Sequence, residues 1–309
     1  MRDSLFRLFV SLLISGGLSQ VDAQERSLII HADDAGMSHS VNLATIEALE
    51  SGLVTSASIM VPCPWFTEFA EYARTHPQYD YGIHLTLNCE WKLYKWGPVA
   101  SAKDVPSLLD ESGFLWGSVP EVAANVRAEE VERELRAQID RAVAAGVPLS
   151  HLDTHMGALV SRPDLIEVYV RLGIDYDLPV LFLRTLDEQT AKAYPAIKES
   201  AGTLLPVLDE HRLPVLDRLV QFYGGDTHEQ RREAYFDAIR NLEPGVSQLI
   251  IHCGILNEEL KAITNSAERR DGDRRIFTAG ETRELLQQEN ITLLTWKQFR
   301  SRVAAELSQ

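Results

Sequence analysis

The chain alternates short apolar runs with helical patterns, and this alternation limits the folds open to it more than any other feature. Several runs are continuously apolar, as expected for strands that are covered on both faces. Strands that alternate with helices form a mainly parallel sheet or barrel. Seven runs come close to the strand count of a (β/α) barrel, or of an incomplete one. The candidate strands are Leu28–Ala32, Ser56–Val61, Gly82–Leu87, Leu149–Leu152, Val180–Leu183, Gln248–Ile251 and Thr292–Leu294.

Helical patterns lie between these runs, and the clearest covers Val122–Ala145, where apolar residues share one stripe and Gly146 follows as a stop. No internal repeat or low-complexity linker interrupts the chain, which favours a single domain. The stretch from Glu268 to Arg275 is expected to be an exposed charged loop. The other predicted helices are Ser40–Glu50, Phe66–Arg74, Asp164–Leu172, Glu188–Glu199, His228–Asn241, Ala279–Gln288 and Trp296–Leu307.

The segment Asn88–Gly117 breaks the alternation and is rich in aromatic residues, among them Trp91, Tyr94 and Trp96. A long aromatic loop after a barrel strand is typical of a sugar-stacking surface or a lid. The alternative is that it covers the core or an oligomer interface.

The N-terminal residues have the pattern of a secretory signal peptide. Two arginines precede an apolar stretch from Leu8 to Leu18, and small or branched residues precede a cleavage point after Ala23. We therefore predict a signal peptide at residues 1–23, a single (β/α) barrel domain at 24–309, and export to the periplasm or the extracellular space. The alternative is an uncleaved anchor. No second long apolar run follows, so we expect no membrane span after cleavage.

Charge and cysteine content restrict the partners and the cross-links. The net charge of −15 over 309 residues argues against nucleic acid or an anionic membrane as a partner. Three cysteines, Cys63, Cys89 and Cys253, allow at most one internal disulfide. We expect Cys253 to be a small core residue, with a redox role as the alternative. The sequence leaves the oligomeric state open, with a homodimer as one option.

Four predicted strand ends each carry an acid or a histidine. Asp33 and Asp34 end the first strand, His84 lies in the third, His151, Asp153 and His155 follow the fourth, and His252 follows the sixth. In a barrel these ends converge on one mouth. Each residue alone has a plain structural explanation, since Asp34 or Ser38 could cap a helix and a lone strand histidine is usually a core residue. Four at equivalent positions are hard to explain by packing.

Neutral imidazoles with one carboxylate suit a borderline divalent ion and leave coordination positions open. A bound ion lowers the pKa of its water and polarises a carbonyl. A second carboxylate can take the proton of that water, and a histidine can protonate the leaving group. These are the groups that metal-assisted hydrolysis of an amide or ester requires.

Three blocks of residues resemble the YdjC-like carbohydrate deacetylases, the family of chitooligosaccharide deacetylases and hopanoid-biosynthesis relatives. They are His31–Ser38, Gly82–Thr86 and His151–His155, and Ile251–Gly254 is similar to the family's His-Pro-Gly segment. The resemblance implies a distorted TIM-like barrel and a divalent metal ion, Mg²⁺ or Zn²⁺, with Mn²⁺, Co²⁺ or Ni²⁺ as options. It also implies removal of acetyl groups from N-acetylated sugars or oligosaccharides.

The resemblance also implies roles for individual residues. Asp34, His84 and His155 match the metal ligands, Asp33 matches the general base, and His252 stands where a catalytic histidine is expected. We expect Asp153 to orient His155 or His252. Trp91 is a candidate for sugar stacking, and Arg184 for substrate contact, with a surface ion pair as its alternative. His151 is expected to support the site or to face the other side of its strand.

Two positions depart from the family pattern. Gly157 stands where many relatives carry a further histidine, and Cys253 replaces a proline after the catalytic histidine. Two alternative functions stay open at this stage. One is another metal-dependent sugar-modifying barrel enzyme, an isomerase or esterase. The other is a non-catalytic exported sugar-binding protein.

Overall fold

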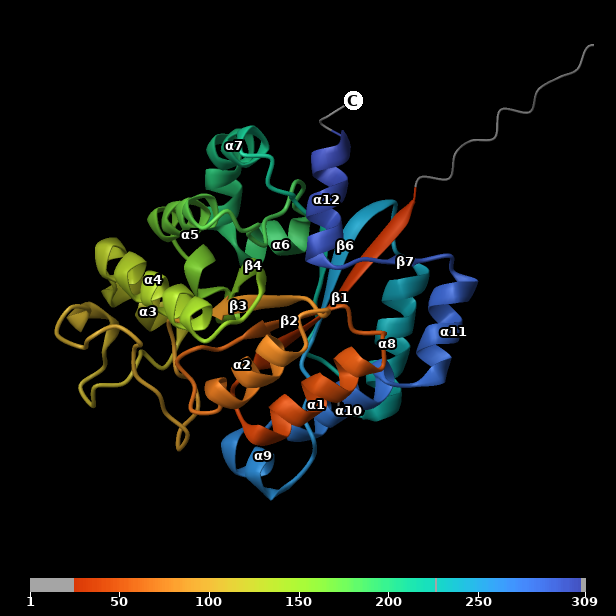
Figure 1. Ribbon diagram of the computed structural model, residues 1–309, viewed down its shortest axis with the longest axis horizontal. Coiled ribbons are helices and arrows are strands. Elements are labelled where there is room, and N and C mark those ends of the chain that lie inside the picture. Colours follow the sequence, from red (N-terminus) through yellow and green to blue (C-terminus); the bar gives the residue numbers. More distant parts are fainter. Residues whose placement is uncertain (1–24, 226, 307–309) are drawn as a thin grey trace, which may run out of the picture.

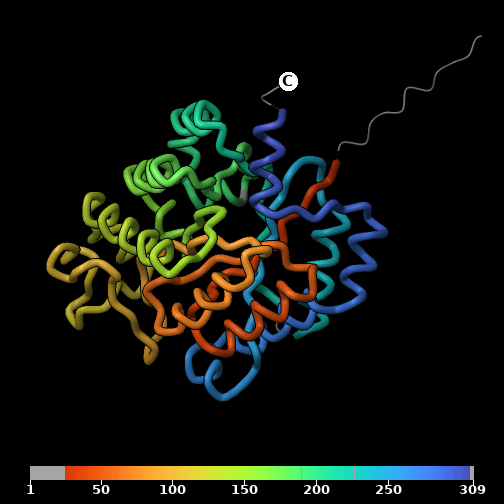
Figure 2. The backbone as a smooth tube through the Cα atoms, in the orientation of Figure 1, coloured from red at the N-terminus to blue at the C-terminus, as the bar shows by residue number. Residues whose placement is uncertain are grey.

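Figure 1 shows the computed structural model, which describes residues 25–225 and 227–306. Strands occupy the centre and helices surround them. The predicted signal peptide lies outside the described residues. The backbone trace in Figure 2 brings the C-terminal helix beside the start of the first strand, where Arg302 Nη2 lies 3.1 Å from Glu25 Oε1.

Every strand pairing in the described part of the chain is parallel. The sheet order is β4-β3-β2-β1-β6-β5, and β7 pairs with β1. This arrangement with its flanking helices is an incomplete (β/α) TIM-like barrel. The strands are β1 Arg26–Ala35, β2 Ser56–Ile59, β3 Tyr81–Leu85, β4 Leu149–Thr154, β5 Arg218–Val220, β6 Gly245–Ile251 and β7 Thr292–Leu293.

The two edges of the sheet are β4 and β5. An irregular segment, Val180–Leu183, lies between them and forms hydrogen bonds toward both sides. Leu181 N donates to Leu152 O at 2.9 Å on the β4 side, and Leu216 N donates to Phe182 O at 3.0 Å on the β5 side. The prediction of a regular strand at Val180–Leu183 is therefore wrong, since this segment forms only isolated bridges. The strand β5 was not predicted because its three residues are only partly buried and because Asp217 and Arg218 interrupt the apolar pattern.

The helices follow most of the predicted positions. The α-helices are α1 His39–Glu50, α2 Phe66–Thr75, α3 Val119–Asn125, α4 Ala128–Ala144, α5 Pro163–Asp175, α6 Glu188–Ala193, α7 Pro195–Glu210, α8 His228–Arg240, α9 Glu258–Ile263, α10 Ala267–Phe277, α11 Gly280–Gln288 and α12 Trp296–Glu306. Two short 3₁₀ helices, η1 Pro106–Leu108 and η2 His155–Val160, complete the set.

Two predicted helices are each broken into two. The helix expected at Val122–Ala145 is interrupted at Val126, whose carbonyl accepts a hydrogen bond from Arg162 Nη1 at 2.9 Å instead of continuing the helix. The helix expected at Glu188–Glu199 ends before Pro195, because proline has no N–H to donate and disfavours helical backbone in the preceding residue.

The prediction of an exposed loop at 268–275 is wrong, because this stretch lies within α10. Its charges do not all face solvent: Arg270 and Asp273 are buried. The buried face of this helix combines Arg270 and Asp273 with the apolar residues Ala267, Ile276 and Phe277.

The barrel interior is apolar at one end and polar at the other. Ile29, His31 and Asp33 share one face of β1, since side chains alternate along a strand. Ile29 packs in an apolar cluster with Trp296 and Phe299 of α12, which covers the N-terminal end of the barrel. The polar side chains of the same face are therefore gathered toward the C-terminal end.

Two further expectations concern cysteines and membranes. Cys63, Cys89 and Cys253 are all free and buried, as expected for small core residues. Among residues 25–225 and 227–306, no helix combines the length and the apolar character needed to cross a bilayer.

Candidate active site

Asp33 and Asp34 reach the same cavity because β1 is irregular at its end. In a regular strand, successive side chains point to opposite faces. Here the register with β2 shifts between Ala32 and Ala35, and Asp34 has a φ of 69°, in the left-handed region. Bulges of this kind re-aim side chains, and such a conformation costs about 1–3 kcal/mol. Both carboxylates consequently line a cavity of about 380 Å³ at the C-terminal end of the strands.

Asp34 does not cap the helix that follows it. Ser38 is the N-cap of α1, and its side chain accepts a hydrogen bond from Val41 N. The side chain of Asp34 is thus free to face the histidines of β3 and η2.

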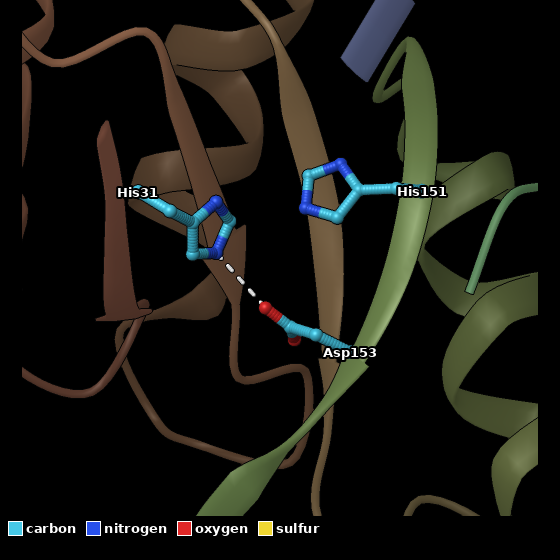
Figure 3. Close-up of side chains that lie close together, drawn as sticks. All are labelled: His31, His151 and Asp153. Atoms are coloured by element: carbon cyan, nitrogen blue, oxygen red, sulfur yellow. Dashed lines mark ion pairs between the residues drawn. The ribbon is translucent and has the colours of Figure 1, made fainter. Parts of the chain in front are cut away.

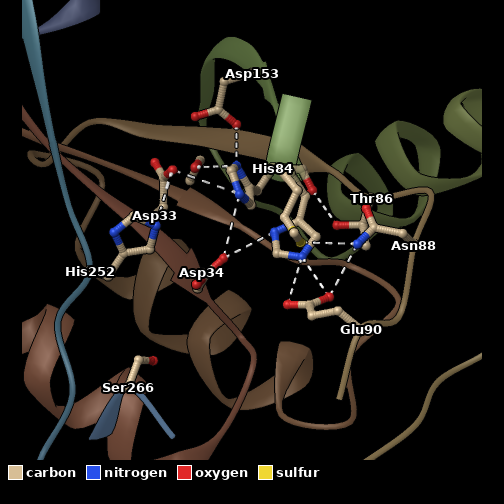
Figure 4. A network of polar contacts seen from close by, with 12 residues as sticks. Asp33, Asp34, His84, Thr86, Asn88, Glu90, Asp153, His252 and Ser266 are labelled. Atoms are coloured by element: carbon tan, nitrogen blue, oxygen red, sulfur yellow. Dashed lines mark hydrogen bonds and ion pairs between the residues drawn. The ribbon is translucent and has the colours of Figure 1, made fainter. Parts of the chain in front are cut away.

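Two of these histidines meet Asp34 in the cavity (Figure 4). His84 Nε2 lies 3.4 Å from Asp34 Oδ1, as Figure 4 shows. His155 Nδ1 lies 3.3 Å from the same oxygen. His84 comes from β3 and His155 begins η2, directly after β4. All three residues are buried. The structure therefore brings together the three residues that the sequence analysis matched to metal ligands.

In each of these histidines, the ring nitrogen that does not face Asp34 contacts a carboxylate. Asp153 Oδ1 lies 2.7 Å from His84 Nδ1, and Glu90 Oε2 lies 3.1 Å from His155 Nε2. Asp153 thus orients His84, whereas the sequence analysis expected it to orient His155 or His252. A carboxylate that accepts from one ring nitrogen fixes the tautomer, so that the other nitrogen is the one that offers a lone pair when the ring is neutral.

Glu90 was missed by the sequence analysis. It lies five residues beyond β3, in the aromatic segment, and belongs to none of the motifs. The only available signal was an acid close after the strand of His84.

The geometry of Asp34, His84 and His155 fits a divalent ion. Two atoms bound about 2.1 Å from one ion lie about 3.0–3.4 Å apart, which matches the distances of 3.3 and 3.4 Å found here. Asp34 Oδ1 is buried without a hydrogen-bond partner. Glu90 and Asp34 raise the pKa of buried His155 to about 10 although burial itself lowers it. This shift expresses how strongly the site attracts positive charge.

Arg270 of α10 fixes the other oxygen of Asp34. Its Nη2 donates to Asp34 Oδ2 at 2.6 Å, and both groups are buried. Burial opposes the charge on Asp34, but Arg270 and the nearby histidines outweigh it and hold the pKa of this carboxyl well below its usual range. Arg270 was not a predicted site residue, because the sequence placed it in an exposed loop.

Asp33 lies between His252 on one side and the pair His84 and His155 on the other. Its Oδ2 is 3.8 Å from His84 Nε2 and 3.8 Å from His252 Nε2, too far for a hydrogen bond in either case. His252 follows β6, and its backbone N–H donates to Asp273 Oδ2 at 3.0 Å. This bond anchors the turn that contains Cys253.

A buried polar network lies beneath the site (Figure 3). His31 Nε2 lies 2.9 Å from Asp153 Oδ2 and 3.2 Å from Asp33 Oδ1. Burial lowers the pKa of His31, but these two carboxylates outweigh it and raise the pKa to about 10. His31 therefore links Asp33 to the carboxylate that orients His84.

His151 belongs to this interior network and does not line the cavity. Its ring stacks on Trp296 with centroids 5.1 Å apart, and its Nδ1 lies 2.9 Å from Ser150 Oγ. The ring occupies the space that a side chain at Gly82 would need, since a Cβ there would lie 2.3 Å from His151 Nε2. Gly82 thus leaves the space that the ring of His151 occupies.

The remaining predicted residues divide between the cavity and the surface. Trp91 lines the cavity. Arg184 does not, and its Nη2 pairs with Asp209 Oδ1 at 2.8 Å in an exposed position, which matches its surface-ion-pair alternative. Trp96 of the aromatic segment is buried in the core, as the core-covering alternative expects. Trp91 lines the cavity, and its role in sugar stacking stays a prediction.

Comparison with known proteins gives matches along most of the chain. Residues 27–288 match the family model described as YdjC-like protein. The chain is 31% identical over 272 residues to a carbohydrate deacetylase of Brevibacillus brevis, covering 88% of this chain and 99% of that protein. It is 36% identical over 275 residues to a carbohydrate deacetylase of Thermus thermophilus, covering 89% and 94%.

A solved structure shares the fold. The crystal structure of a candidate cellobiose-phosphate cleavage protein from Enterococcus faecalis has a TM-score of 0.73 and 26% sequence identity, over 89% of this chain and 98% of that chain. Because the family match runs from β1 to α11, it contains each of the cavity residues described above.

Proposed function

The chain belongs to the YdjC-like protein family, and from that premise we propose that it removes acetyl groups from N-acetylated sugars with the help of a divalent metal ion. One observation carries the proposal: the two neighbouring acids of β1 have different surroundings. Asp34 joins His84 and His155, while Asp33 lies outside that set and near His252. A ligand set with a separate base beside it is what metal-assisted hydrolysis requires.

In this proposal Asp34, His84 and His155 hold the ion. A divalent ion bound there would polarise the carbonyl group of the substrate and lower the pKa of a bound water. Mg²⁺ and Zn²⁺ are the first candidates, and a set of two imidazoles and one carboxylate also accepts Mn²⁺, Co²⁺ or Ni²⁺. Asp153 and Glu90 keep the two imidazoles in the tautomers that leave a lone pair facing Asp34.

Asp33 and His252 handle the protons. Asp33 accepts the proton of the attacking water, and His252 donates a proton to the amine nitrogen as the C–N bond breaks, which yields acetate and the free amino sugar. Burial lowers the pKa of His252, against the opposing effect of Asp34 and Asp33. A lowered pKa leaves the ring neutral at neutral pH, so in this proposal His252 takes up the proton that Asp33 accepted from the water. The protonated ring is then a strong acid toward the leaving amine.

The cavity supplies surfaces for a sugar. Trp91, Tyr194 and Tyr223 line it, and aromatic rings are suited to pack against the apolar faces of sugar rings. Tyr223 lies beside the proposed acid, with its ring centroid 5.6 Å from that of His252. We propose that the leaving amino sugar is bound on this side.

The test is acetate release from a panel of N-acetylated and O-acetylated sugars, with protein that starts at Gln24. Chelated protein should be inactive, and adding back one divalent ion at a time should restore release from at least one N-acetylated sugar. Release from O-acetylated sugars alone would reassign the protein as an esterase. No release despite one bound ion per chain would favour a sugar isomerase or a binding protein.

A further inference from the structure

A second, smaller cavity lies behind Asp33 and His84. Its volume is about 60 Å³, and its polar wall is formed by Asp33, His84, Asp153 and Thr154. The rest of the wall is mostly apolar. It comprises Val160, Leu181, Phe182, Leu183, Ile197, Leu219 and Ile250, together with Thr190, Tyr194 and Gln221. We propose that this cavity binds the alkyl end of the acyl group and that it accepts propionyl and butyryl groups as well as acetyl. The proposal rests on the proposed function and adds its acyl specificity.

The cavity exists because the barrel closes irregularly. Leu181, Phe182 and Leu183 belong to the segment that joins β4 to the β5 side through isolated bridges only. A regular strand would bring its neighbours into continuous contact, whereas this segment leaves space between itself and β5. The space lies at the C-terminal end of the barrel, next to the catalytic residues.

The two cavities adjoin each other at the catalytic groups. Asp33, His84 and Ile250 line both of them. In the proposed reaction the acyl carbon must lie close to Asp33 and to the ligand set that includes His84. One substituent of that carbon, the amine nitrogen with its sugar, occupies the large cavity.

Besides its oxygen and its nitrogen, the acyl carbon carries the alkyl group, which needs an apolar wall. The large cavity offers charged groups near the ligand set, among them Glu90, Arg270 and Asp273. The small cavity offers aliphatic and aromatic carbon directly beyond Asp33 and His84. Burying an alkyl group there is favourable, whereas placing it against the charged groups would leave them without water or a partner.

The volume exceeds what an acetyl group requires. A water-sized group needs about 10–15 Å³ of such space, so a cavity of about 60 Å³ holds about four to six of them. An acetyl group places one methyl beyond the carbonyl carbon, and a butyryl group places three carbons there. Each further methylene buried should strengthen binding about fourfold.

The experiment compares the N-acetyl, N-propionyl and N-butyryl derivatives of one amino sugar by following release of the amine. Wild-type kcat/KM for the propionyl substrate should equal or exceed that for the acetyl substrate. Leu219→Phe should lower the propionyl-to-acetyl ratio at least tenfold by filling the cavity, and Leu219→Ala should raise the butyryl-to-acetyl ratio. Leu256→Phe, a matched change at an exposed leucine that lines neither cavity, should leave both ratios unchanged.

A binding measurement keeps the test independent of turnover and of the folding of the variants. Titration of the wild-type, metal-loaded protein with acetate, propionate and butyrate should give affinities that rise about fourfold per methylene. A rising series without amide hydrolysis would support the cavity assignment and contradict the proposed function. Hydrolysis of the acetyl substrate with a flat series, or with a ratio unaffected by Leu219→Phe, would overturn the cavity assignment alone.

Discussion

Removing the carboxylate of Glu90 should weaken metal binding without unfolding the protein. Glu90 contacts His155 Nε2 with both oxygens, at 3.1 and 3.2 Å, and its side chain is 19% exposed. Glu90→Gln keeps an acceptor but loses the charge. The loss is then the difference between a charged and a neutral hydrogen bond, about 1–1.5 kcal/mol, or about five- to twelvefold in metal affinity. Glu90→Ala removes the acceptor altogether and should cost about 10- to 100-fold.

The assay is competition for the metal with a chromophoric chelator, combined with thermal unfolding of the metal-free protein. Glu111→Ala is the matched control, because it removes an exposed carboxylate from the same segment. The control should leave the affinity unchanged, and the melting temperatures of the metal-free variants should stay close to that of the wild type. Unchanged metal affinity in Glu90→Ala would refute the claim that this carboxylate fixes the tautomer of His155.

Three further predictions concern packing, the surface and export. Gly82→Ala should destabilise the protein by about 1–3 kcal/mol in a denaturant titration, because the new Cβ would overlap the ring of His151; a stability equal to that of the wild type would mean that the ring moves freely. Arg184→Ala should leave kcat/KM for the N-acetylated substrate unchanged and alter stability by less than about 1 kcal/mol, because the pair with Asp209 is exposed; a large loss of activity would place Arg184 at the substrate. Expression with the full leader should yield exported protein whose N-terminal residue is Gln24, which N-terminal sequencing checks; retention of residues 1–23 would support the uncleaved anchor.

The strands and the clustering of chemical groups could be predicted because both leave local signals. Buried parallel strands contain short apolar runs, such as Leu28–Ile30 in β1 and Leu249–Ile251 in β6, and an acid or a histidine stands at or just after the end of each strand. Once the strands are known to be parallel, their C-terminal ends must lie together, so Asp34, His84 and His155 were expected in one site. The family resemblance added the division of roles between Asp33 and Asp34.

The parts that were not predicted depend on contacts between distant segments. Arg270 and Asp273 lie in a stretch whose composition is that of an exposed loop, and only their pairing with Asp34 and Arg231 makes their burial favourable. Glu90 is defined by its contact with His155, 65 residues away. The break at Val126 depends on Arg162, which sequence periodicity cannot reveal.

The central claim is that Asp33 acts as the general base and is not a metal ligand. Measuring acetate release and metal content together on Asp33→Asn tests it most directly. The account predicts that this variant binds one divalent ion with wild-type affinity, because Asp34, His84 and His155 are intact, and that its turnover of an N-acetylated sugar falls by about 10²–10⁴-fold. Loss of the metal together with activity would contradict the account, since it would make Asp33 a ligand rather than the base. Wild-type turnover in this variant would contradict it equally, because the proton of the attacking water would then have another acceptor.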